Sequence, residues 1–139
     1  KSILFDKLYK HFDGDLKGKT IALWGLAFKP GTDDMREAPS LVLIERLKAA
    51  GCNVRAFDPV AIGEAKRRIG DSIYYANDIY DALHEADALM LVTEWKEFRM
   101  PNWSIIRKAM NHPVIIDGRN IFDSHDLTEQ GFTYYCIGR

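Results

Sequence analysis

The sequence of 139 residues has little net charge, few cysteines and no long hydrophobic run. Its formal net charge of −1 argues against a nucleic-acid-binding surface, which requires an excess of basic residues. No apolar run approaches the roughly 18 residues that a membrane-spanning helix needs. Charged residues interrupt the first twenty positions, so these cannot form the apolar core of a signal peptide. We therefore expect a soluble, cytoplasmic protein that binds neither nucleic acid nor membrane.

Cysteine and histidine are too sparse and too scattered to indicate a metal or redox site. Cys52 and Cys136 have neither CxxC spacing nor a nearby histidine. Free cysteine is commonly a buried packing residue, and we assign both to packing. The four histidines share no spacing typical of metal ligands, and we assign them to the surface. The sequence therefore predicts no metal site.

The sequence does have enough apolar residues, 47% of the total, to build the core of one domain without disulfide or metal crosslinks. Hydrophobic periodicity predicts alternating strands and helices. The predicted strands are 20–24, 53–57, 88–92, 114–116 and 133–137, with 73–75 as an optional sixth; the predicted helices are 1–12, 39–50, 62–69, 78–84 and 103–110. This alternation predicts a single α/β domain with a Rossmann-like, doubly wound, mostly parallel sheet, preceded by an N-terminal helix.

The segment 24–40 is the most informative, because ligands of open parallel sheets bind beyond the carboxyl ends of the strands. It lacks GxGxxG, so it is not a standard dinucleotide-binding turn. Lys29 is a flexible cation that could reach a diphosphate, and Arg36 offers a planar fork for a second phosphate or a carboxylate. The alternative is that Asp33 and Asp34 neutralise both cations in a surface loop. Composition alone favours this alternative.

A second candidate group, including Asp117 and Arg119, follows the predicted strand 114–116. We expect this fourth strand to lie beside the first strand across the switch point of the sheet. Arg119 and Lys29 would then converge on one crevice, where two cations favour a diphosphate. The alternative is that Arg119 pairs with Asp117 or Asp123.

Three further side chains are interpreted as structural. Asp58 ends the second strand, as does the acid that binds a ribose in dinucleotide-binding folds. Because Pro59 follows, capping or turn formation is the favoured role for Asp58. Trp95 and Phe98 are assigned to core or rim packing rather than to base stacking.

Four segments, in this order and spacing, carry a family resemblance. They are GKTIALWGLAFKPGTDDMREAPS at 18–40, FDPVA at 57–61, ADALMLVTEWKEF at 86–98 and IIDGRN at 115–120. Together they resemble the C-terminal domain of UDP-glucose 6-dehydrogenases, over nearly the whole chain. GDP-mannose and UDP-N-acetylmannosamine dehydrogenases carry related turns, so these remain alternatives, as does a non-catalytic module that binds a nucleotide sugar.

The resemblance implies a domain division and a reaction. Residues 1–17 would be the end of an interdomain helix and its linker, and 18–139 the UDP-sugar-binding domain. Members of the family oxidise the C6 alcohol of UDP-glucose to the carboxylate of UDP-glucuronate, in two NAD-dependent steps through a thiohemiacetal on a cysteine. Neither Cys52 nor Cys136 matches that nucleophile, so we expect no catalytic residue in this segment and no turnover by it alone. We expect the full-length enzyme to be a homo-oligomer.

The resemblance also implies which residues bind ligands. Phe28 and Lys29 of the FK pair and Arg119 of the DGRN turn are implied to contact UDP-glucose. Lys29 and Arg119 would neutralise the diphosphate, and Phe28 would flank the uridine. Arg36 is implied to reach the NAD, which is bound mainly by an N-terminal domain that these residues do not include.

Overall fold

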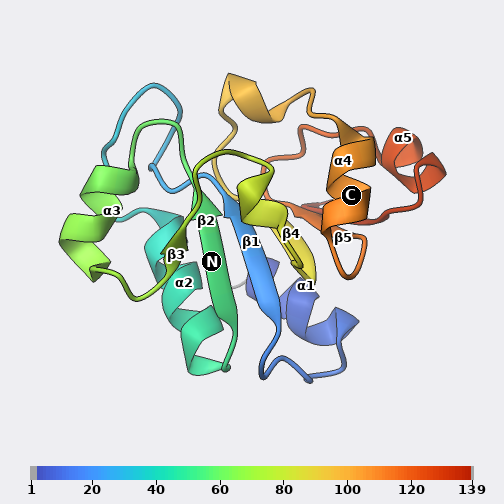
Figure 1. The fold of residues 1–139 in the computed structure, drawn as a ribbon, viewed down its shortest axis with the longest axis horizontal. Helices are drawn as coiled ribbons and strands as arrows, with labels where there is room; N and C mark the ends of the chain where they lie inside the picture. The colour runs from blue at the N-terminus through green and yellow to red at the C-terminus, as the bar shows by residue number, and fades with distance from the viewer. Residues whose placement is uncertain (1–2, 139) are drawn as a thin grey trace.

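The computed structural model describes residues 3–138 and is built around one six-stranded sheet of strand order β3-β2-β1-β4-β5-β6 (Figure 1). All neighbouring strands are parallel. The strands are β1 (Thr20–Trp24), β2 (Asn53–Phe57), β3 (Tyr74–Tyr75), β4 (Ala88–Leu91), β5 (Val114–Asp117) and β6 (Thr133–Cys136). The chain moves outward from β1 to one edge, then returns beside β1 and moves to the other edge. This confirms the predicted doubly wound α/β fold.

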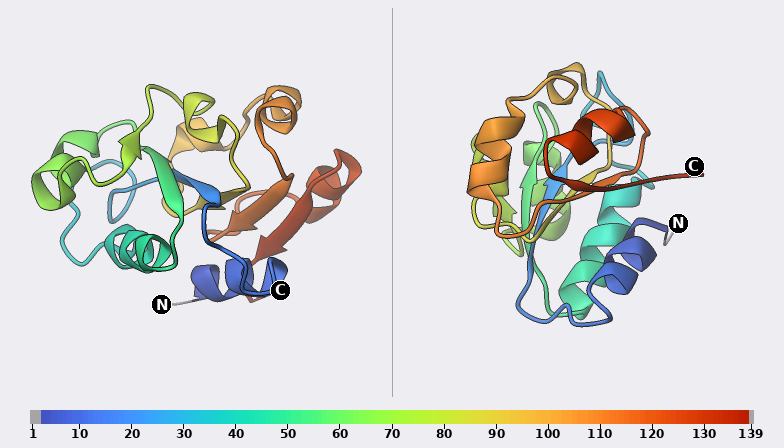
Figure 2. Two further views of the ribbon diagram at one scale, coloured as in Figure 1. Left: turned by 60° about the horizontal axis from the view of Figure 1, so that its bottom comes forward. Right: turned by 90° about the vertical axis from the view of Figure 1, so that its right-hand side faces the viewer.

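Helices cover the sheet and its edges. They are α1 (Ile3–His11), α2 (Pro39–Ala49), α3 (Ile62–Ile69), α4 (Trp103–Ala109) and α5 (Ser124–Glu129), with two 3-10 helices, η1 (Asp81–Leu83) and η2 (Lys96–Phe98). Figure 2 shows α1 and α2 on one face of the sheet and α4 on the other. The predicted N-terminal helix is confirmed as α1. Within residues 3–138, no helix is long and apolar enough to cross a membrane.

The central strands are buried on both faces, which explains their continuous apolar sequences. All four residues of β4 and of β5 are buried, as are 21–24 of β1. A parallel strand covered by helices on both sides has no solvent-facing side, so an alternating pattern is not expected there. The Trp24 ring stacks on Phe98 with their centroids 5.1 Å apart, and the Trp24 indole N–H donates to the Ile79 carbonyl at 3.1 Å. Phe98 is therefore a packing residue, as the sequence predicts.

The strand order corrects one expectation. The strand beside β1 is β4, with Trp24 opposite Leu91, whereas β5 lies one strand further out. The predicted fourth strand, 114–116, is therefore not the neighbour of 20–24. The cause is that the chain crosses back after β3 and re-enters the sheet as β4. The segment that adjoins the end of β1 is thus the one after β4.

Two local predictions also differ from the structure. The predicted helix 78–84 is a turn followed by η1, in which the Asp78 carboxylate accepts the backbone N–H groups of Tyr80 and Asp81. Only one 3-10 turn follows this turn, so the predicted helix does not form. Helix α5 was not predicted, because its six residues include one buried side chain, Leu127, and so have no apolar stripe.

Gly25 allows the chain to leave β1 beside the segment after β4, and this generates a stability prediction. Gly25 has φ +106°, and a Cβ there would lie 2.5 Å from both the backbone nitrogen and the Cβ of Thr93. We expect Gly25→Ala to lower the free energy of unfolding by about 2 to 5 kcal/mol, measured by urea denaturation.

The control is Gly31→Ala. Gly31 also has a positive φ, +86°, but the added Cβ would lie in open space. It keeps the backbone strain without the clash, and we expect a loss of about 1 to 2 kcal/mol. Equal losses for the two variants would show that the contact with Thr93 is not what requires glycine at position 25.

Candidate functional site

The candidate site is the carboxyl edge of the sheet, at the top of Figure 1, where the segments after β1, β2, β4 and β5 lie. Ligands of open α/β sheets bind at this edge. The segment after β1 carries Phe28, Lys29 and Arg36, and that after β5 carries Arg119. Hydrogen bonds between these segments determine which side chains are presented to solvent.

Asp58 joins three of the segments. Its Oδ2 accepts the backbone N–H groups of Leu26 at 2.7 Å and Ala27 at 3.0 Å, both after β1. The same oxygen accepts the indole N–H of Trp95, after β4, at 3.0 Å. Trp95 is 8% exposed. It is therefore a packing residue, as predicted, whose indole N–H also holds a loop.

The other oxygen of Asp58 holds the start of the connection to α3. Oδ1 accepts the backbone N–H groups of Val60 and Ala61, both at 2.8 Å. Asp58 is 2% exposed, and its two oxygens accept five protein donors. The turn-forming role favoured by the sequence is confirmed, and the carboxylate is not presented to a ribose.

Two hydroxyl groups hold the carbonyls of the same short stretch of backbone. Thr93 Oγ donates to the Ala27 carbonyl at 2.7 Å, and Ser40 Oγ donates to the Leu26 carbonyl at 2.7 Å. Both hydroxyl residues are buried. The N–H and C=O groups of residues 26 and 27 are thus all bound by side chains, so the chain entering position 28 is fixed.

Phe28 and Lys29 follow this fixed stretch and point into solvent. The Phe28 side chain is 53% exposed, although its backbone N–H donates to the Asp34 carbonyl at 2.7 Å and closes the loop. Lys29 is exposed and forms no ion pair or hydrogen bond with any residue in 3–138. An exposed aromatic ring beside an unpaired cation is an arrangement suited to a phosphorylated ligand.

Arg36 is paired within its own loop. Its Nε donates to Asp34 Oδ1 at 3.1 Å and its Nη2 to Oδ2 at 3.0 Å, and its backbone N–H also donates to Oδ1 at 2.9 Å. The Arg36 side chain is 80% exposed. The side-chain and backbone hydrogen bonds from Arg36 lower the pKa of Asp34 to about 2. Internal neutralisation, one of the two alternatives, therefore holds for Arg36 but not for Lys29.

Arg119 is paired with a residue that the sequence patterns do not single out. Its Nε lies 3.0 Å from Glu94 Oε1, and its Nη2 donates to Oε2 at 3.1 Å. The expected alternative partners, Asp117 and Asp123, do not pair with its side chain. Asp117 instead accepts the Arg119 backbone N–H at 3.0 Å, and Asp123 accepts the backbone N–H of Asp126 at the start of α5.

Glu94 was missed because its role depends on strand order. It follows β4 by three positions, and β4 lies between β1 and β5. Desolvation would raise the pKa of this carboxylate, but its own backbone N–H and Arg119 outweigh that effect and lower it. Phe28, Lys29, Arg36 and Arg119 all lie in segments at one edge. No contact within the described residues joins Lys29 to Arg119, so their convergence stays a prediction.

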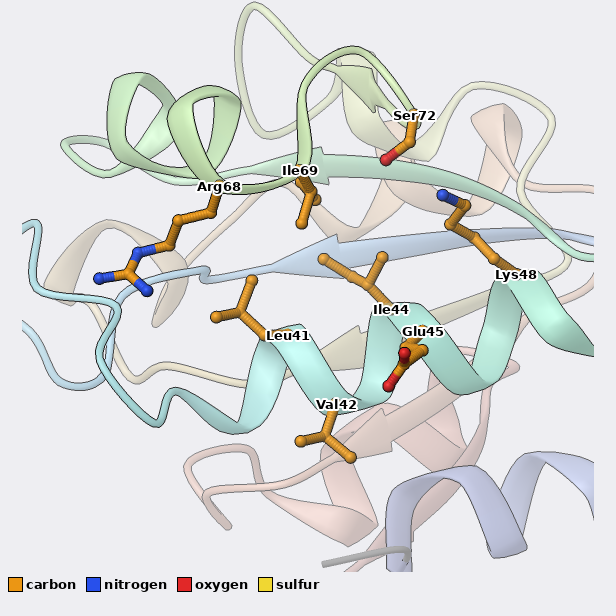
Figure 3. Close-up of a pocket in the computed structure, with 8 residues that line it drawn as sticks. All are labelled: Leu41, Val42, Ile44, Glu45, Lys48, Arg68, Ile69 and Ser72. Atoms are coloured by element: carbon orange, nitrogen blue, oxygen red, sulfur yellow. The ribbon is translucent and has the colours of Figure 1, made fainter.

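A groove of about 540 Å³ lies elsewhere, between α2 and α3. Figure 3 shows Leu41 and Ile44 of α2 pointing toward Ile69 of α3, with Arg68 and Lys48 at the two ends. Four of its eight lining residues are aliphatic, and none of the candidate binding residues lines it. The groove is therefore separate from the candidate site.

Cysteine and histidine contribute nothing to the site. Cys52 is buried, with its Sγ 3.5 Å from the Leu16 carbonyl, and burial raises the pKa of its thiol to about 11. Its assignment to packing is confirmed, while Cys136 is half-buried in β6. His11 is half-buried rather than exposed, with its Nδ1 2.7 Å from the Tyr135 hydroxyl. Among residues 3–138 no group of His, Cys, Asp and Glu could hold a metal ion.

Comparison with known proteins places this arrangement in a family. Residues 22–124 match the model of the UDP-glucose/GDP-mannose dehydrogenase family, UDP binding domain. The UDP-glucose 6-dehydrogenase of Pseudomonas aeruginosa is 49% identical over an alignment of 144 positions, which covers 100% of this chain and 32% of that protein. The chain thus spans about a third of that curated relative.

Two solved structures extend the comparison. The UDP-D-ManNAc dehydrogenase of Pyrococcus horikoshii superposes with a TM-score of 0.75 and 31% identity, over 99% of this chain and 30% of that one. The UDP-glucose dehydrogenase of Pyrobaculum islandicum superposes with a TM-score of 0.77 and 26% identity, over 95% and 28%. The fold is therefore shared by dehydrogenases that are named for different sugars.

The environment of Asp58 generates a stability prediction. In Asp58→Asn the amide group must face at least two of the N–H donors, which then lose their acceptor while buried. We expect the free energy of unfolding to fall by about 3 to 5 kcal/mol, measured by urea denaturation. Asp123→Asn is the control, because asparagine caps a helix about as well as aspartate. A similar small loss in both variants would contradict the central role of Asp58.

The Asp34–Arg36 pair generates a pH prediction. Because the pKa of Asp34 is lowered from 3.8 to about 2, the stabilisation from this pair is complete above about pH 4 and is lost as the pH falls toward 2. Carboxyl NMR titration should give a midpoint near 2, and Arg36→Ala should move it toward 3.8. Lys29→Ala should leave the midpoint unchanged. A midpoint of 3.8 in the parent protein would contradict the pairing.

Proposed function

This chain belongs to the UDP-glucose/GDP-mannose dehydrogenase family and matches the UDP-binding domain of its members, and we propose that it binds the substrate nucleotide in an NAD-dependent UDP-glucose 6-dehydrogenase. That enzyme would convert UDP-glucose to UDP-glucuronate. The observation that carries the proposal is the pair Phe28 and Lys29, which is exposed and unpaired at the end of a backbone stretch fixed by Asp58, Thr93 and Ser40.

The proposed roles follow from the chemistry of the side chains. The Lys29 ammonium group would bind an oxygen of the diphosphate, and the Arg119 guanidinium would bind the same group through charge-assisted hydrogen bonds. The Phe28 ring would pack against the uridine end of the ligand. Because a phosphate contact by an ionised group is stronger than one between neutral groups, Lys29 and Arg119 supply most of the expected affinity for the diphosphate.

The remaining assignments concern the whole enzyme. Residues 18–139 would form the UDP-sugar-binding domain, and 1–17 the end of the interdomain helix and its linker. Arg36 would contact NAD that is bound mainly by another domain. The intact enzyme would act in the cytoplasm as a homo-oligomer, and the catalytic cysteine would lie outside this segment. The 49% identity to a UDP-glucose 6-dehydrogenase favours UDP-glucose over UDP-N-acetylmannosamine, since relatives named for the latter are 24% to 31% identical.

Calorimetric titration of this 139-residue chain tests the proposal. We expect UDP-glucose and UDP to bind and GDP-mannose not to bind. Lys29→Ala should weaken UDP binding by about 1.5 to 3 kcal/mol, or roughly 10- to 150-fold, because one charge-assisted phosphate contact is lost.

The matched control is Lys108→Ala, which removes an exposed lysine from the last turn of α4. Its affinity for UDP should equal that of the parent protein. Equal binding of GDP-mannose, or a Lys29→Ala variant that binds UDP as tightly as the parent, would contradict the proposed ligand or the proposed role of Lys29.

A further inference from the structure

We propose that Glu94 is a positioning residue for nucleotide-sugar binding, which holds one edge of the Arg119 guanidinium so that the opposite edge faces the diphosphate. This inference rests on the proposed function, in which Arg119 contacts the substrate. It adds a carboxylate that need not touch the ligand itself. Glu94 would act by fixing the direction in which Arg119 points.

The geometry of the pair leaves part of the guanidinium available. Glu94 engages Arg119 through Nε, at 3.0 Å, and Nη2, at 3.1 Å. A guanidinium has five N–H donors, and those of Nη1 have no partner within the described part of the chain. The Arg119 side chain is 51% exposed and that of Glu94 is 27% exposed. A ligand can therefore approach the Nη1 side while Glu94 keeps its hold.

The two residues that flank Glu94 in the sequence are buried and hydrogen-bonded. Its neighbours Thr93 and Trp95 are 1% and 8% exposed, respectively. Thr93 donates to the Ala27 carbonyl, Trp95 donates to Asp58, and the Trp95 backbone N–H donates to the Thr93 carbonyl at 3.0 Å. The backbone that carries Glu94 is therefore tied to the segments after β1 and β2.

The backbone of Arg119 is fixed from the other side. Its N–H donates to the buried Asp117 carboxylate at 3.0 Å, and the preceding Gly118 N–H donates to the Leu91 carbonyl at 2.9 Å. A Cβ on Gly118 would lie 2.7 Å from that carbonyl oxygen, so only glycine permits the approach. The ion pair between Glu94 and Arg119 thus joins two segments whose backbones are already in place.

Fixing the arginine in advance has a thermodynamic consequence. A free arginine side chain loses rotamer freedom when it is immobilised on a ligand, which weakens binding. In this structure Glu94 restricts the side chain before the ligand arrives, so less of that cost falls on binding. Although desolvation would raise the pKa of Glu94, its own backbone N–H and Arg119 lower it, consistent with a hold that persists at neutral pH. Lys29, which is unpaired, supplies the uncompensated positive charge.

A double-mutant cycle tests the inference, with UDP titrated into the 139-residue parent, Glu94→Gln, Arg119→Ala and the double variant. Glutamine cannot accept both N–H groups of the fork. We expect Glu94→Gln to weaken UDP binding about five- to tenfold in the parent and to have no further effect in the Arg119→Ala background. Glu97→Gln, at an exposed position of η2, is the control and should bind UDP like the parent.

A spectroscopic readout separates positioning from general destabilisation. The Nε–H NMR signal of Arg119 should shift or broaden in Glu94→Gln without ligand, while the urea midpoint stays within error of the parent value. Tighter UDP binding by Glu94→Gln would show that Glu94 competes with the ligand and would overturn the inference. So would an affinity equal to that of the parent, or an equal loss in the Arg119→Ala background. Absence of UDP binding by the parent itself would instead overturn the proposed function.

Discussion

The carboxyl edge of this domain depends on the buried carboxylate of Asp58. A buried ionised group is costly unless nearby donors replace its hydration, and here five N–H groups do so. These donors come from the segments after β1, β2 and β4, so hydrogen bonds to one carboxylate hold all three segments in place. If one segment moved away, the carboxylate would lose donors in a site that water does not reach. Hydrogen bonds to Asp58 thereby connect three loops that are not joined to one another by strand pairing.

This edge combines a fixed backbone with side chains in three different states. The peptide groups at positions 26 and 27 are bound by Asp58, Thr93 and Ser40, whereas the Phe28 and Lys29 side chains immediately beyond are exposed. The two arginines are each held by a carboxylate, Arg36 by Asp34 within one loop and Arg119 by Glu94 across two. A planar guanidinium can bind anions on more than one edge, but an ammonium group cannot be shared in this directional way. In the function proposed above, the unpaired lysine and the paired arginines would therefore make different kinds of contact with a ligand.

The sequence predicted what depends on local pattern and missed what depends on distant pairing. Continuous apolar runs identified the buried strands, and Pro59 indicated that Asp58 forms a turn. The order of the strands was wrong because the short strand at 73–75 was treated as optional: β3 has only two paired residues, and counting it makes 88–92, not 114–116, the fourth strand. Glu94 was missed because an isolated glutamate after a strand has no local signature, and its partner becomes adjacent only once β4 is known to lie between β1 and β5.

The orientation of Asp58 distinguishes this edge from that of the usual dinucleotide-binding fold. In the common arrangement an acid near the end of the second strand is free to bind a ribose. Here the acid at the end of β2 is turned inward, with one oxygen accepting N–H groups at the start of the connection to α3 and the other accepting N–H groups after β1. The same residue cannot satisfy these donors and also face a sugar. This orientation of Asp58 is consistent with our proposal that nucleotide recognition at this edge uses the segments after β1 and β5, where the exposed Lys29 and Arg119 lie.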